Sequence, residues 1–69
     1  MTWTVTFHDE NSPEAAKTTR RVPGHLVSLM VMECVTKDDW FPLLWRADVI
    51  MLRLEKGERR MTYIIELED

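Results

Sequence analysis

The sequence is poor in the residues that reinforce small folds or build common cofactor sites. It has one cysteine, Cys34, so no intramolecular disulfide can form. That cysteine and two dispersed histidines, His8 and His25, do not make a zinc site. The only two glycines, Gly24 and Gly57, lie too far apart for a glycine-rich phosphate loop. We therefore expect no metal and no cofactor, and we expect tight packing or self-association to support the fold.

Long apolar runs and an excess of positive charge are also missing. No apolar run approaches the roughly 20 residues of a membrane helix, so no membrane association is expected. Twelve acidic and nine basic residues give a net charge of −3, which argues against nucleic acid as the main partner. The first ten residues lack the basic and apolar regions of a signal peptide, and a lone cysteine fits a reducing cytoplasm. A cytoplasmic location is therefore expected.

The first third of the chain predicts two strands. Residues 2–8, "TWTVTFH", alternate between large apolar side chains and polar ones, which is typical of a half-buried strand. Residues 18–22, "TTRRV", could pair with it as a second strand beyond a polar turn. Arg20 and Arg21 would suit a sheet edge, because charge there blocks further strand pairing.

Residues 23–36, "PGHLVSLMVMECVT", form the longest apolar segment and favour a helix. Fourteen residues is a typical length for a helix and long for a strand, although the three valines leave a buried strand as the alternative. At 100° per residue one apolar face gathers four side chains: Val27, Met30, Val31 and Cys34. The apolar surface spreads beyond this face, so such a helix needs cover on more than one side.

The C-terminal part predicts a hairpin, with strands at 46–55 and 60–68 and Gly57 in the turn. With Lys56-Gly57 as a two-residue turn, Leu52 would pair with Met61. That register puts seven apolar residues on one face: Ile50, Leu52, Leu54, Met61, Tyr63, Ile65 and Leu67. A turn one residue longer would instead put Val49 and Met51 on the face of Tyr63. In either register the second face of the sheet stays partly apolar.

Together these elements predict one α+β domain over residues 1–69. Its expected architecture is a small antiparallel sheet of three or four strands with one helix packed on one face. The expected order is β-(β)-α-β-β, with residues 18–22 as the optional strand. The segment 40–45, "WFPLLW", is expected to be irregular, because Pro42 disrupts both helices and central strands.

The titratable residues do not predict an enzyme or a small-molecule site. His8, Asp9 and Glu10 are consecutive on an extended strand and point to alternating sides, so they do not converge. Cys34 and His25 fall on opposite faces of the predicted helix, where Cys34 would act as a small buried hydrophobe. We therefore expect no catalytic residues and no evident small-molecule substrate.

Three tryptophans and five methionines are many for 69 residues, and both residue types suit contact surfaces. Filling a small core would explain the same residues. The predicted partner-binding residues are Trp40, Phe41, Trp45, Met32, Val49 and Met51.

These residues favour a small non-enzymatic protein-binding module that forms a homodimer. By its size alone, the chain resembles small proteins of bacteria, phages and mobile elements. A more specific hypothesis is therefore an inhibitor or regulator of a bacterial host protein. The alternative is a nucleic-acid-associated regulator, which would use the two arginine pairs Arg20, Arg21, Arg59 and Arg60.

Overall fold

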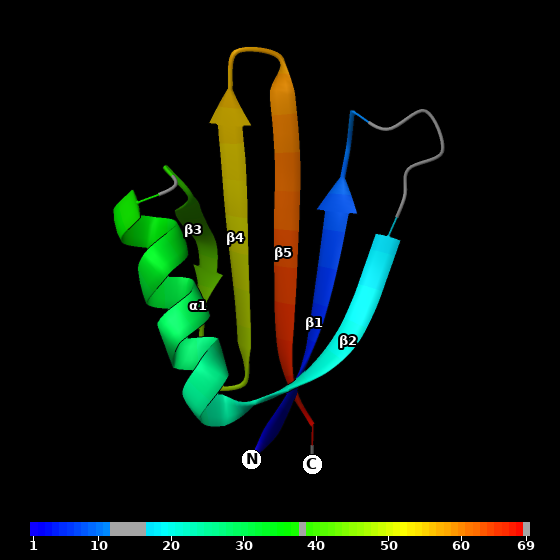
Figure 1. The fold of residues 1–69 in the computed structure, drawn as a ribbon, viewed down its shortest axis with the longest axis vertical. Coiled ribbons are helices and arrows are strands. Elements are labelled where there is room, and N and C mark those ends of the chain that lie inside the picture. Colours follow the sequence, from blue (N-terminus) through cyan, green and yellow to red (C-terminus); the bar gives the residue numbers. More distant parts are fainter. Residues whose placement is uncertain (12–16, 38, 69) are drawn as a thin grey trace.

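A computed structural model describes residues 1–11, 17–37 and 39–68, which form an antiparallel sheet and a helix (Figure 1). Along the chain the elements are β1 (Thr2–Asp9), β2 (Lys17–Pro23), α1 (Gly24–Lys37), β3 (Phe41–Trp45), β4 (Val49–Lys56) and β5 (Arg59–Glu68). The sheet order is β2-β1-β5-β4-β3, and every neighbouring pair is antiparallel. β5 is therefore the central strand, and β2 and β3 are the edges.

The expected sheet of three or four strands was wrong, because the sheet has five strands and the order is β-β-α-β-β-β. The additional strand is β3, which contains Pro42. Proline excludes a central strand but is tolerated at an edge, where a missing N–H need not break the ladder. The pairing of β3 with β4 shifts register between Pro42 and Leu44, which is the local adjustment of a β-bulge.

The other predicted elements are confirmed. β1 and β2 pair as an antiparallel hairpin, and β2 lies at an edge. The apolar segment is a helix rather than a strand, and its predicted inner face is buried at Val27, Val31 and Cys34. The length of this segment was therefore a better guide than its valine content.

The C-terminal hairpin turns at Gly57-Glu58, one residue later than the turn considered from the sequence. Lys56 pairs with Arg59, so Leu52 lies opposite Tyr63 instead of Met61. This moves the pairing by two residues, which leaves the predicted apolar face unchanged because strand side chains repeat with period two. Gly57 has a φ of 62°, the positive value that the first central position of a type II′ hairpin turn requires.

The core lies between α1 and the middle of the sheet. Leu52 and Ile65, from the adjacent strands β4 and β5, are fully buried. In the described part of the chain, eight apolar side chains make up the buried cluster: Val5, Val27, Val31, Cys34, Trp40, Leu52, Leu54 and Ile65. One cluster of this size is small, so single core substitutions remove a large share of the stability.

Trp40 enters this core from the connection between α1 and β3. Asp39 adopts a φ of 59°, and the Trp40 N–H donates to the carbonyl oxygen of Cys34 at 3.3 Å. Aspartate tolerates this left-handed conformation better than most residues. The chain therefore turns back at the end of α1, and the Trp40 ring packs against that of Tyr63 in a tilted arrangement, with ring centroids 4.8 Å apart.

Replacing Gly57 by alanine should lower the free energy of unfolding by about 1–2 kcal/mol, because a Cβ makes a positive φ costly. No atom lies within 4 Å of the added Cβ, so the loss is conformational rather than steric. Urea denaturation followed by circular dichroism measures it. A D-alanine at the same position, introduced by chemical synthesis, should not lose this stability. Equal losses for both alanines would contradict the explanation.

Truncating Leu52 to alanine should cost about 2–5 kcal/mol, because the site is fully buried and leaves a cavity. In a domain of this size that loss is comparable with the total stability. The matched control is Leu26→Ala on the exposed surface of α1, which should change stability by less than about 0.5 kcal/mol. Thermal denaturation of both variants compares them, and similar melting temperatures would contradict the assigned core.

Candidate functional site

An apolar groove of about 410 Å³ lies between α1 and the β3 side of the sheet. Val27 and Val31 of the helix lie at its inner side, and Ile50 of β4 lies opposite them. Trp45 lies on the same side of the sheet because it is the register partner of Ile50. The lining residues are Trp3, Gly24, Val27, Ser28, Val31, Met32, Val35, Thr36, Trp45 and Ile50. None of them carries a charge.

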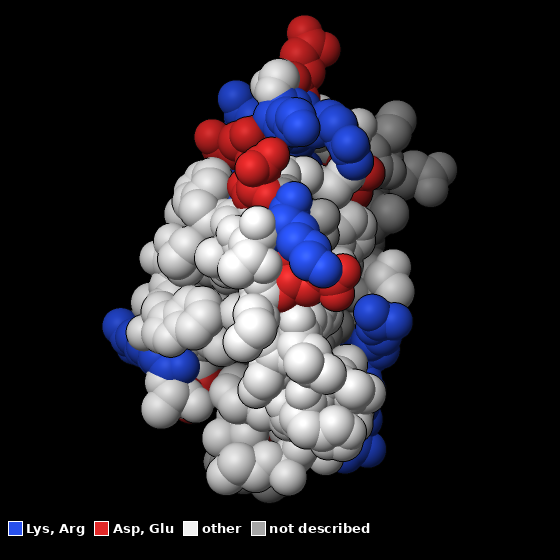
Figure 2. Space-filling view, turned by 60° about the vertical axis from the view of Figure 1, so that its left-hand side comes forward, with Lys and Arg blue, Asp and Glu red and all other residues white. Residues whose placement is uncertain are grey.

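Two large side chains of the groove remain strongly exposed. Met32 is 63% exposed and Trp45 is 60% exposed. On α1, Leu29 and Val35 lie three residues before and after Met32 and are also exposed. Because residues three apart are neighbours on a helix surface, these three form a continuous apolar ridge, Leu29–Met32–Val35. Figure 2 shows many charged side chains toward the top of this view, a broad uncharged surface in its middle and lower part, and further basic side chains at its left and right edges.

In the groove beside α1 the structure brings together two of the predicted partner-binding residues, Met32 and Trp45. Trp40 is 8% exposed and belongs to the core, so it offers little surface to a partner. Phe41 pairs with Arg53 and therefore lies on the face of the sheet opposite α1. Val49 and Met51 lie on that opposite face as well and are half-buried there.

Sequence reasoning missed Leu29 and Val35 as members of this surface. The available signal was the width of the apolar stripe on the helix, which exceeds what one sheet face covers. The sequence does not show which flank of the stripe the sheet buries. That choice depends on how α1 crosses the strands.

The four arginines of the nucleic-acid alternative do not form one patch. Adjacent residues in a strand point to opposite faces, so Arg20 and Arg21 separate, as do Arg59 and Arg60. Arg21 also pairs with Glu68, its Nε lying 2.8 Å from Oε2. A joint phosphate-binding footprint of all four is therefore excluded by the register.

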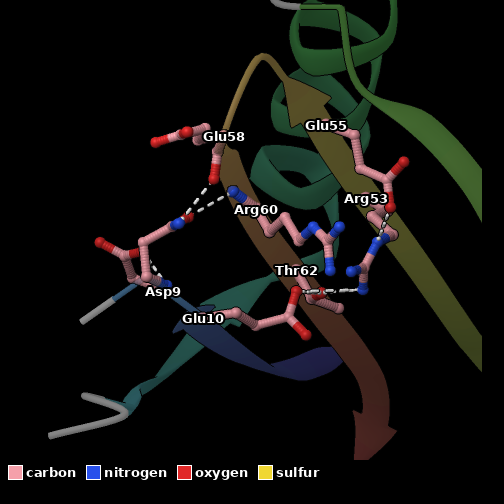
Figure 3. Close-up of polar contacts among 8 residues, drawn as sticks. Asp9, Glu10, Arg53, Glu55, Glu58, Arg60 and Thr62 are labelled. Carbon is pink, nitrogen blue, oxygen red and sulfur yellow. Dashed lines mark hydrogen bonds and ion pairs between the residues drawn. The ribbon is translucent and has the colours of Figure 1, made fainter. Parts of the chain in front are cut away.

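On the face opposite α1, Arg53 of β4 makes polar contacts with β5 and with Glu10, the residue after β1 (Figure 3). Its Nη1 lies 3.0 Å from Oε2 of Glu10 and 3.3 Å from the Thr62 hydroxyl, and its Nε lies 2.8 Å from Oε1 of Glu55. The hydrogen bond to Glu55 raises the pKa of Arg53, burial opposes this, and the charge of Glu10 adds to the rise. The guanidinium therefore stays charged and acts as a cross-strand tie rather than as an acid or base.

Asn11 extends the pairing of β1 and β5 beyond the end of β1. Its side-chain amide donates to the carbonyl oxygen of Glu58 at 2.6 Å, and its side-chain oxygen accepts the Arg60 N–H. The Glu10 N–H donates to the carbonyl oxygen of Arg60 at 3.0 Å. These contacts give Glu10 and Asn11 a structural role.

The nucleophilic and metal-ligating residues do not converge. Cys34 is buried in the core, and His25 is exposed on α1. The Nε2 atom of His8 is buried without a hydrogen-bond partner. Within residues 1–11, 17–37 and 39–68, no group of three histidine, cysteine or carboxylate side chains could hold a metal ion.

α1, the helix of the described segments, is too short to cross a membrane. Comparison with models of protein families, with curated protein sequences and with solved structures finds no match for this chain. The surfaces of the chain itself are therefore the guide to its function, and the groove beside α1 is lined almost entirely by apolar surface.

Proposed function

We propose that this protein is a small non-enzymatic protein-binding module that pairs with a second copy of itself through the groove beside α1. The observation that carries the proposal is the shared position of Met32 and Trp45. Both line one apolar groove, and both are more than half exposed. Large apolar side chains that lie together at a surface mark interaction sites more often than isolated ones do.

The size of this surface fits a dimer interface. Tryptophan alone can bury about 150–250 Å², and Trp45 leaves more than half of its surface exposed. With the ridge Leu29–Met32–Val35, the exposed apolar area is on the order of several hundred Å², comparable with the largest patch of a typical monomer. Adding the polar rim at Ser28 and Thr36 brings it toward the ~800 Å² per partner of a standard interface.

The shape of the surface suits a second copy. A twofold interface is self-complementary, so each copy must present both the projecting part and the cavity that receives it. Here the ridge of α1 projects beside the groove that contains Trp45. In an antiparallel arrangement of two α1 helices, the ridge of each copy would enter the groove of the other. The small core gives a further reason, because a dimer buries apolar area that one copy leaves in water.

A heterologous partner would use the same surface. The inhibitor or regulator role expected from the sequence then means competition between that partner and the second copy for the groove. In that case the homodimer would dissociate into single copies when the partner binds. The same interface variants would weaken both associations.

Sedimentation equilibrium across the micromolar range tests the dimer. The wild type should approach twice its monomer mass of 8.2 kDa. Met32→Glu places a charge in the centre of the interface and should raise the dissociation constant about thirtyfold or more. Trp45→Ser should act in the same direction, because it removes the largest apolar contact.

The matched control is Phe41→Ser. Phe41 is an exposed aromatic residue of β3, the strand of Trp45, but lies on the face of the sheet opposite α1. This substitution should leave the dimer intact. Circular dichroism checks that all variants stay folded, as expected for substitutions at exposed positions. A wild type that remains monomeric at the highest concentration, or a dimer weakened equally by Phe41→Ser, would contradict the proposal.

A further inference from the structure

A second hollow, of about 570 Å³, lies on the same side of the sheet as α1 but beyond the C-terminal end of the helix. Figure 1 shows the β4–β5 hairpin projecting past this end of α1. The helix therefore does not cover the part of β4 and β5 next to the hairpin turn. We name this site the hairpin hollow, and its volume lies within the range of about 300–1,000 Å³ typical of ligand sites.

Aromatic rings form the inner surface of the hairpin hollow. Phe7 of β1 and Tyr63 of β5 are register partners, and their ring centroids lie 5.1 Å apart. The ring of Trp40, which is itself largely buried, lies 4.8 Å from that of Tyr63 and supports it from the core. Phe7 and Tyr63 are only half-buried, so part of the aromatic surface is open to the hollow. Such a surface can stack against the flat face of a ligand ring, whatever substituents that ring carries.

Three cations surround these rings: Lys37 at the end of α1, and Lys56 and Arg59 on either side of the hairpin turn. Among the described residues, the hollow contains one carboxylate, that of Asp39. Asp39 pairs with Lys56 at 3.7 Å, and both side chains are about three-quarters exposed. A pair so open to water is weak and leaves most of the positive potential in place.

This positive charge is unusual for the molecule as a whole, which carries a net charge of −3. The carbonyl groups at the end of α1 would explain a cation at Lys37, because they favour positive charge in the last turn. They do not explain Lys56 and Arg59, which belong to the hairpin. A smaller hollow that shares Phe7 and Tyr63 is lined by Arg20, which adds a fourth cation to the same side of the sheet.

We propose that the hairpin hollow binds a nucleotide unit, with the base against the aromatic rings and the phosphate against the cations of its rim. Base stacking on aromatic side chains, combined with a positively charged path for the backbone, is the chemistry of single-strand recognition. The same pair of contacts would also hold a free nucleotide. The site shares no residue with the groove beside α1, so it stands independently of the proposed dimer.

Two probes distinguish the sources of the base–phosphate unit: a fluorescein-labelled oligothymidylate, followed by fluorescence anisotropy, and adenosine monophosphate as its competitor. Binding of the oligonucleotide should weaken with rising salt, because phosphate contacts release counterions. In a ¹⁵N–¹H spectrum the indole N–H of Trp40 should shift on titration. Competition by the mononucleotide would assign the site to free nucleotides, and its absence would assign it to single strands.

The register of β5 offers a matched pair of variants. Arg59→Glu reverses a charge at the hollow and should weaken binding at least tenfold. Arg60→Glu makes the same change at the next residue, which points to the opposite face, and should weaken binding less than twofold. Failure of both probes to bind at millimolar nucleotide concentration, or equal losses from the two variants, would overturn the proposal. Met32→Glu should leave binding unchanged, which separates this result from the fate of the dimer.

Discussion

α1 contacts the sheet through one narrow row of buried side chains. The width of this contact decides which parts of the sheet stay uncovered. Val27, Val31 and Cys34 form the buried side of the helix and pack over a layer that includes Leu52 and Ile65. A helix of 14 residues is about 21 Å long and about 10 Å wide. Five strands spaced about 4.8 Å apart make a sheet roughly twice as wide as the helix. One helix therefore cannot cover this face.

The uncovered parts of the face differ in their chemistry. On the β3 side, the groove is lined by uncharged residues and contains Met32 and Trp45. Beyond the helix end, the hairpin hollow combines aromatic rings with cations such as Lys56 and Arg59. A dimer formed through the groove would bury apolar surface that a small domain keeps exposed at a cost in stability. It would leave the charged hollow free for a ligand.

Local periodicity predicted most of the elements, because each of them buries one face and its apolar residues therefore repeat at a regular spacing. β1 alternates with period two, and the inner face of α1 repeats with period 3.6, so both are visible in the sequence. β3 was missed because Pro42 was weighed as a disruptor of central strands, whereas the strand lies at an edge and contains a bulge. The groove beside α1 was predicted only in part. It combines residues of α1 with Trp45 of β3, and the distance between these two elements depends on the strand order of the sheet.

The sequence by itself determined the alternation of β1, the inner face of α1 and a glycine-dependent hairpin at Gly57, because each depends on neighbours along the chain. Only the tertiary structure decided the different places of the tryptophans in "WFPLLW". The left-handed conformation of Asp39 turns Trp40 into the core, and the pairing of β3 with β4 leaves Trp45 in an open groove. Their positions relative to the helix depend on long-range pairing, which no local pattern encodes.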